Sequence, residues 1–117
     1  MSWRAIAPEQ WSDFLQRFSA RHEGSLVNLS GTIATPSDYV PLRELRFVED
    51  SEDSTLLVSV GDVATPTLLR FRSPRTMRVE LSEKAIERAL LVEGLRGELT
   101  LRFRNAIPPE LIDGPAP

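Results

Sequence analysis

The spacing of the hydrophobic side chains changes near residue 25, and this change constrains the fold more than any other feature. Over residues 8–22 the large apolar residues recur with the period of an α-helix, about 3.6 residues. The stripe consists of Trp11, Phe14, Leu15 and Phe18, with His22 at its end. From Ser25 onward the period is about 2, as in a β-strand. The chain is therefore predicted to form an N-terminal amphipathic helix followed by strands.

Signals for both ends of the helix flank this stripe. Pro8 suits the first helical position after a cap at Ala7, because the N–H of that position has no partner within a helix. Ile6 and Trp11 are spaced as the two halves of a hydrophobic staple. Gly24 can adopt the left-handed conformation that ends a helix. These signals place the helix where the period does.

The alternating segments after residue 25 are short and closely spaced. Their inward-facing residues are Val27, Leu29, Ile33, Leu45, Phe47, Leu56, Val58, Val60, Leu69, Phe71, Met77, Val79, Leu81, Leu99, Leu101 and Phe103. The links between them are too short for the helical crossovers that parallel strands need. We therefore expect an α+β fold, in which the helix packs on a bent antiparallel sheet of six to seven strands. Such a sheet can curl into a small half-open barrel.

Residues 82–93 allow two interpretations. Ser82 as a cap, an apolar face and Gly94 as a stop favour a short helix. The alternative is a turn over residues 82–86 and a strand over about 87–94, which forms a hairpin with the next strand. We prefer the turn and strand, because glycines and a clear strand follow directly.

Length and composition favour one globular domain. The chain has 117 residues, of which 41% are hydrophobic and 26% are charged, and this is enough for one core without metals or disulfides. No linker interrupts residues 1–107, whereas residues 108–117 include four prolines. The sequence therefore predicts a single α+β domain over 1–107 and a proline-rich tail over 108–117.

Several functional classes are excluded by residues that are missing. The chain has no cysteine, so thiol catalysis and thiolate metal sites are excluded. The first residues lack the apolar core of a signal peptide, and the longest aliphatic run, Ala89–Val92, is too short to span a bilayer. We therefore expect a cytoplasmic protein that does not enter a membrane.

Both ends of the chain resemble a known family. The resemblance rests on Trp11, Phe14, Phe18-Ser19 and His22-Glu23-Gly24, and on Leu101-Arg102-Phe103-Arg104 and Pro108-Pro109-Glu110. These residues are similar to the opening and the ending of an uncharacterised bacterial family of small proteins, catalogued as a domain of unknown function. The resemblance implies an α+β architecture. It implies no activity and no catalytic residue.

The tetrapeptide Leu-Arg-Phe-Arg occurs twice, at residues 69–72 and 101–104. In a strand, alternation places Leu and Phe on the core face and both arginines on the opposite face. If the two strands lie close together, the arginines form a patch that binds phosphates or carboxylates. These arginines are Arg70, Arg72, Arg102 and Arg104. The alternative is a solvated face whose arginines pair with Glu44, Glu80 or Glu98.

His22 is the only histidine, so any Ser–His–carboxylate relay or His-ligated metal must use it. It lies in the last helical turn of the apolar stripe, where a histidine satisfies terminal carbonyls and interacts with the helix dipole. We interpret His22 as structural and assign no catalytic residue.

An acidic cluster offers oxygen ligands for a divalent cation. Its members are Glu49, Asp50, Glu52 and Asp53. Thr55 stands where a calcium-binding loop needs its glycine, and charged turns also prevent aggregation between strands. We assign no metal site and no cofactor.

Three functional hypotheses remain. The leading one is a non-enzymatic binding or assembly module that associates with a protein partner or with itself, because catalytic motifs are missing and sheet edges can accept partners. The second is binding of nucleic acid or another polyanion by the four arginines, with Trp3 and Tyr39 as candidates for base stacking. The net charge of −3 restricts such binding to a local patch. The third is a small hydrolase or transferase that uses His22 with a neighbouring acid.

Overall fold

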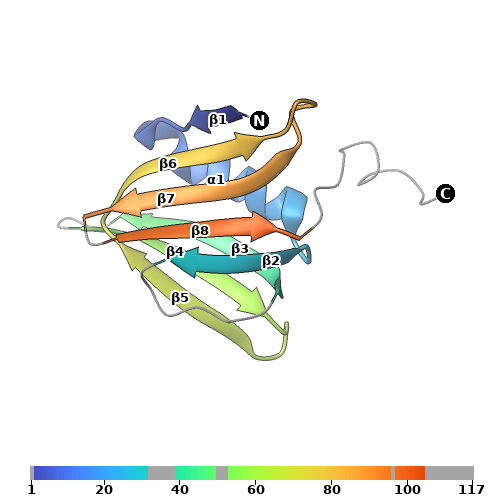
Figure 1. Cartoon of the computed structure of the whole chain (residues 1–117). Helices are drawn as coiled ribbons and strands as arrows, with labels where there is room; N and C mark the ends of the chain where they lie inside the picture. The colour runs from blue at the N-terminus through green and yellow to red at the C-terminus, as the bar shows by residue number, and fades with distance from the viewer. Residues whose placement is uncertain (1, 32–38, 50–52, 96, 105–117) are drawn as a thin grey trace.

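The structure, a computed structural model, describes residues 2–31, 39–49, 53–95 and 97–104. This part of the chain forms one α-helix and one open sheet of eight antiparallel strands in the order β1-β6-β7-β8-β2-β3-β4-β5 (Figure 1). The elements are β1 (Ser2–Ala5), the 3-10 helix η1 (Pro8–Gln10), α1 (Trp11–His22), β2 (Leu26–Gly31), β3 (Val40–Glu49), β4 (Ser54–Gly61), β5 (Pro66–Arg72), β6 (Pro74–Leu81), β7 (Glu87–Gly94) and β8 (Gly97–Phe103). The predicted α+β class with an antiparallel sheet is confirmed.

The predicted number of six to seven strands is wrong, because β1 adds an eighth. All four residues of β1 are exposed, so no alternation of apolar and polar residues marks this segment in the sequence. Its position comes from pairing with β6, in a register that runs from Ser2 opposite Leu81 to Ala5 opposite Arg78. A strand without buried side chains cannot be found by a search for hydrophobic periodicity.

The helix begins and ends as its flanking residues predict. Pro8 opens a 3-10 turn that continues into α1, and Ala7 precedes it in an extended conformation. The indole N–H of Trp11 donates to the carbonyl of Ile6 at 2.8 Å, and both side chains are buried. Gly24 has a φ of +86°, a left-handed conformation that costs glycine little.

A helical serine completes the backbone bonding of β3. Among the described residues, β2 pairs with β3 only at Val40 and Pro41. Beyond Leu42, this edge of β3 lies beside α1 and not beside a strand. The hydroxyl of Ser19 donates to the carbonyl of Leu45 at 3.1 Å and accepts from its N–H at 2.8 Å. A buried N–H or C=O without a partner costs free energy, so this one side chain replaces the missing strand at Leu45.

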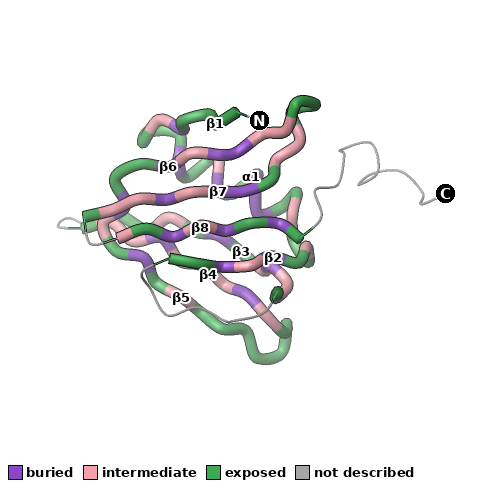
Figure 2. The backbone as a smooth tube through the Cα atoms, viewed as in Figure 1, coloured by how far each residue is buried: buried purple, intermediate pink, exposed green. Residues whose placement is uncertain are grey.

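One hydrophobic core lies between the helix and the concave side of the sheet. In Figure 1, β6, β7 and β8 lie in front, with α1, β3 and β4 behind them. Figure 2 shows buried positions alternating with exposed or intermediate ones along these strands. The core includes Trp11, Leu15, Phe18, Val27, Leu42, Leu56, Val58, Phe71, Met77, Val79, Leu90, Leu99 and Leu101. The predicted inward faces of the helix and of these strands are therefore those that are buried.

The preferred interpretation of residues 82–94 is confirmed, since a turn leads into β7. The hydroxyl of Ser82 accepts from the N–H groups of Lys84 and Ile86, and Ala85 adopts a φ of +62°. Local bonding by Ser82 therefore stabilises a tight turn where the helical interpretation needs a cap.

Some predictions concern residues outside the described part. Ile33, Asp50, Glu52 and the tail at 108–117 lie there. The single domain over 1–107 stays a prediction.

Candidate functional site

The two Leu-Arg-Phe-Arg segments do not form one patch of neighbouring strands. They lie on β5 and β8, and β2, β3 and β4 stand between these two strands in the sheet. Figure 1 shows β8 in the middle of the sheet and β5 at its border. The four arginines of the sequence hypothesis therefore belong to two surfaces, which differ in their chemistry.

On the β8 surface, the arginines have partners. Arg102 reaches across the small Ala89, which pairs with both strands, and its Nη1 lies 2.9 Å from Oε1 of Glu80. Glu80 is buried, with 5% of its surface exposed. The guanidinium of Arg104 lies 5.8 Å from the ring centroid of Tyr39. The predicted pairing of this face with Glu80 is thus present for Arg102.

Neighbouring cations on the same surface are also occupied. Arg78 forms an ion pair with Glu93, and its guanidinium lies 5.9 Å from the ring centroid of Trp3. Both aromatic residues that the sequence offers for base stacking are therefore covered on one side by an arginine of this surface.

The other surface, which we call the β3–β5 face, is the outward side of these three strands. It consists of Glu44, Arg46, Val48, Thr55, Leu57, Ser59, Leu68, Arg70 and Arg72, which alternate with inward residues. The register places Arg46 opposite Leu57 and Leu57 opposite Arg70, in one row across the sheet. Arg72 lies opposite Thr55 on the next row. Three arginines from two strands therefore share this face.

These three arginines are exposed and unpaired. Arg46, Arg70 and Arg72 take part in none of the ion pairs formed among the described residues. Glu44 is the only acid among the nine residues of the face. Apolar side chains lie between the charges, with Val48 exposed to 42% and Leu68 to 50%. The face therefore offers free guanidinium groups beside apolar surface.

Sequence reasoning missed Arg46, although a signal was present. Leu45-Arg46-Phe47 repeats the first three residues of the tetrapeptide. A search for the shorter pattern finds three strands with an outward arginine, and two of them belong to this face.

β5 is also an edge strand. Within the described ranges it pairs only with β4, in a register that runs from Thr55 opposite Arg72 to Gly61 opposite Pro66. An edge strand presents N–H and C=O groups that can bond with another extended chain. β5 thus combines a free edge with two unpaired arginines.

His22 contacts two residues that are far from it in the sequence, Glu87 and Phe103. Its Nε2 is 2.7 Å from Oε1 of Glu87, and Arg21 makes hydrogen bonds to both oxygens of the same carboxylate. The imidazole lies 4.6 Å from the ring of Phe18 and 4.3 Å from the ring of Phe103, between centroids. This cluster ties the end of α1 to the start of β7.

The electrostatics of the cluster favour an ionised Glu87. Burial of its carboxyl group opposes ionisation, but hydrogen bonds from His22 and Arg21, and the charge of Arg21, outweigh that cost. The pKa of Glu87 is therefore lowered from its ordinary value of 4.5. Among the described residues, the hydrogen-bond partner of the His22 side chain is the carboxylate of Glu87, and the structural role of His22 stays a prediction.

The described residues include no group of three or more His, Cys, Asp or Glu side chains that could hold a metal ion. Two members of the predicted acidic cluster, Asp50 and Glu52, lie outside these residues. No helix of the described chain is long and apolar enough to cross a membrane.

Comparisons with family models, with curated proteins and with solved structures found no match to this chain. The family resemblance of the two chain ends therefore stays a prediction.

Proposed function

We propose that the protein is a non-enzymatic binding module that accepts an extended acidic segment of a partner protein as an additional strand along β5. The observation that carries this proposal is the coincidence of a free strand edge with unpaired arginines, Arg70 and Arg72, and with Arg46 one row inward.

The backbone of β5 supplies affinity that does not depend on the partner's sequence. Its seven residues from Pro66 to Arg72 match the length of an average strand. In strand addition, main-chain hydrogen bonds hold the ligand, and alternate side chains determine specificity. A partner segment along this edge therefore needs about seven extended residues.

The side chains of β5 select acidic residues at alternate positions of the partner. Side chains directly opposite in an antiparallel pair have Cβ atoms about 5 Å apart, so carboxylates on the outward face meet Arg70 and Arg72. Leu68 favours an apolar residue on the same face. The expected ligand is a strand with two acids and one apolar residue on one side.

Two other occupants fit this face less well. Nucleic acid bound as a single strand needs aromatic platforms, and none of the chain's aromatic residues points outward from β3–β5, because Phe47 and Phe71 face the core. A second copy of the chain, paired edge to edge, brings the same arginines onto one joined face, where like charges repel. Charge complementarity favours an acidic protein segment.

The test measures fluorescence anisotropy of labelled nine-residue peptides in which Glu alternates with Val. We expect saturable binding, no binding of the Lys/Val peptide, and about tenfold weaker binding to an Arg70→Gln/Arg72→Gln protein, since each exposed ion pair contributes about 0.2–1 kcal/mol. Arg88→Gln, an exposed arginine of β7, is the matched control and leaves binding unchanged.

Backbone methylation of the peptide separates strand addition from simple charge attraction. Two peptides are compared, each methylated on alternate backbone nitrogens. In one, the methyl groups replace the N–H groups that point toward β5 and block its hydrogen bonds. In the other, they replace the N–H groups that point away from β5 and leave those bonds intact. Equal affinity of the two methylated peptides contradicts the proposal. Tighter binding of a single-stranded RNA, or a dimer at micromolar concentration in light scattering, favours the rejected occupants and also overturns it.

A further inference from the structure

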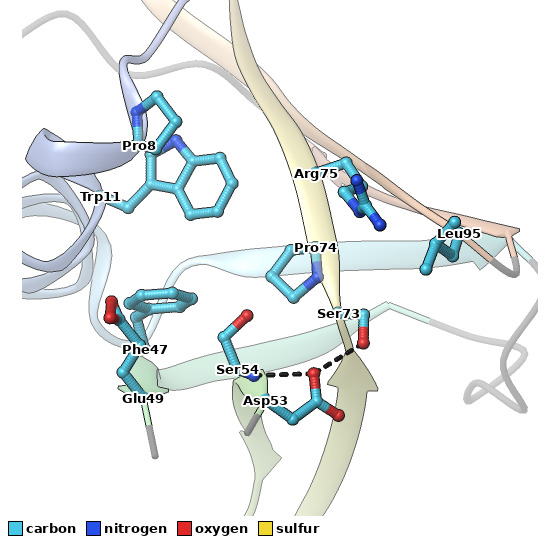
Figure 3. A pocket seen from close by; sticks show the side chains of 10 residues that line it. All are labelled: Pro8, Trp11, Phe47, Glu49, Asp53, Ser54, Ser73, Pro74, Arg75 and Leu95. Atoms are coloured by element: carbon cyan, nitrogen blue, oxygen red, sulfur yellow. Dashed lines mark hydrogen bonds between the residues drawn. The ribbon is translucent and has the colours of Figure 1, made fainter. Parts of the chain in front are cut away.

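A cavity of about 630 Å³ opens at the end of the core opposite the His22 cluster. Figure 3 shows its walls, which come from the start of the helical region, from the end of β3, from the start of β4, from the start of β6 and from the turn after β7. The lining residues are Pro8, Trp11, Phe47, Glu49, Asp53, Ser54, Ser73, Pro74, Arg75 and Leu95. A volume of this size suits a small organic ligand.

Half of the residues that line the cavity are apolar, and the other half are polar or charged. Trp11 and Phe47 meet edge to face, with centroids 5.5 Å apart and planes at 90°, and Pro8 and Pro74 flank them in Figure 3. The indole N–H of Trp11 is already bonded to the carbonyl of Ile6. Trp11 is buried, with 4% of its surface exposed, so only a small apolar edge of its ring reaches the cavity.

Arg75 is the one cationic side chain among the lining residues. It is exposed and forms no ion pair with any residue in the described ranges. Figure 3 places Arg75 beside Leu95, on the opposite side of the cavity from Glu49. Its guanidinium is therefore free for an anion.

Asp53, the acid nearest the base of the cavity, is already engaged. Its Oδ1 accepts from the N–H of Ser54 at 2.8 Å and from the hydroxyl of Ser73 at 2.7 Å (Figure 3). These donors satisfy the carboxylate within the wall. Asp53 thereby connects the start of β4 with the turn between β5 and β6.

A second cavity of about 600 Å³ shares Pro8, Trp11 and Arg75 with the first. The rest of its lining includes Ala5, Ile6, Ala7 and Met77, so it extends the apolar wall along β6. Arg75 thus lines both spaces.

We propose that this cavity binds a small aromatic carboxylate. The planar body of the ligand packs against Trp11, Phe47 and Pro74, and its carboxylate accepts hydrogen bonds from Arg75, whose planar fork matches carboxylate geometry. The site is distinct from the edge of β5 and does not depend on the peptide-binding proposal.

The test uses 2-naphthoate as the probe, with calorimetry for affinity and NMR for location. A Trp3→Phe protein leaves a single indole N–H signal, that of Trp11, which we expect to shift on titration. Arg75→Gln is expected to weaken binding at least tenfold, and the neutral 2-naphthamide is expected to bind at least tenfold more weakly than 2-naphthoate. The matched control, Arg88→Gln, is expected to bind as the unmodified protein does.

Two results overturn the proposal. One is equal affinity of 2-naphthoate for the unmodified protein and for Arg75→Gln, with an unchanged unfolding temperature as proof that the variant is folded. The other is tighter binding of dodecanoate than of 2-naphthoate, because a flexible acyl chain would then be the better fit. The Arg70→Gln/Arg72→Gln protein should retain 2-naphthoate binding, so failure of one proposal leaves the other intact.

Discussion

The same tetrapeptide has opposite surroundings at its two positions. On β8, which has β7 on one side and β2 on the other, Arg102 finds Glu80 across one intervening residue. On β5, which has a neighbour on one side only, Arg70 faces Leu57 and has no acidic partner in the described part of the chain. The same tetrapeptide therefore meets a counter-ion two strands away, on β6, when it lies in β8, and meets none among the described residues when it lies in β5.

The largest expected change in the free energy of unfolding comes from replacing a glycine by alanine. The replacement is compared between the β2–β8 region and the β4–β5 border of the sheet. Gly31, where β2 meets β8, has a φ of +138°, and an added Cβ would collide with the carbonyl oxygen of Glu98. Gly61, at the end of β4, has a φ of +98°, but the nearest atom to an added Cβ is 3.9 Å away. We expect Gly31→Ala to lower the free energy of unfolding by about 3 kcal/mol and Gly61→Ala by about 1 kcal/mol.

Urea unfolding at neutral pH measures both variants. Equal losses would show that the β8 side is no more tightly packed than the border of the sheet, and the contrast between the two regions would fail.

A smaller effect is expected from removing one arginine on each surface. Arg102→Gln leaves the buried carboxylate of Glu80 without its cation, and we expect a loss of about 2 kcal/mol in the free energy of unfolding. Arg70→Gln removes an exposed, unpaired charge, and we expect a change within about 0.5 kcal/mol. Thermal and urea unfolding of the two variants provide the comparison, and a larger loss for Arg70→Gln would contradict it.

The smallest effect depends on pH and involves Glu87, on the β7 side. Because the folded-state pKa of Glu87 is below its ordinary value of 4.5, its contribution to stability is present above that value and is lost as the pH falls through the folded-state pKa. We expect Glu87→Gln to lower the free energy of unfolding by about 1–2 kcal/mol at pH 7 and to flatten its decrease at acid pH.

Glu44→Gln, on the β3–β5 face, is the control for this measurement. Glu44 is exposed and has no ion-pair partner among the residues that the structure describes, so its removal should leave the acid dependence unchanged. The interpretation of Glu87 fails if both variants respond alike to acid.

The secondary structure could be predicted where burial gives the sequence a period. The stripe from Trp11 to Phe18 marks α1, and alternation marks the strands from β2 to β6 and β8, whereas the segment of β7 also allowed a helix. β1 escaped because none of its residues is buried. Burial is a property of side chains, and β1 is held by its backbone.

The candidate site could be predicted only in part, because the hydrophobic period identifies strands and their faces but not the order of the strands in the sheet. Alternation identified Arg70 and Arg72 as outward residues, and Arg46 could have been found by the same pattern. Which arginines meet an acid depends on contacts between distant strands, such as that between Arg102 and Glu80. The cavity beside Arg75 joins residues from five elements, η1, α1, β3, β4 and β6, and from three connections between strands, so no local spacing in the sequence predicts it.

The hydroxyl of Ser19 has a consequence for any chain that shares this architecture. It acts as donor and acceptor at one backbone position of β3, a double task that threonine can perform and alanine or valine cannot. A chain that keeps the helical stripe but lacks a hydroxyl here leaves the N–H and C=O of Leu45 without this partner, which costs free energy at a buried position. The junction between helix and sheet thus rests on one small polar side chain inside an apolar contact.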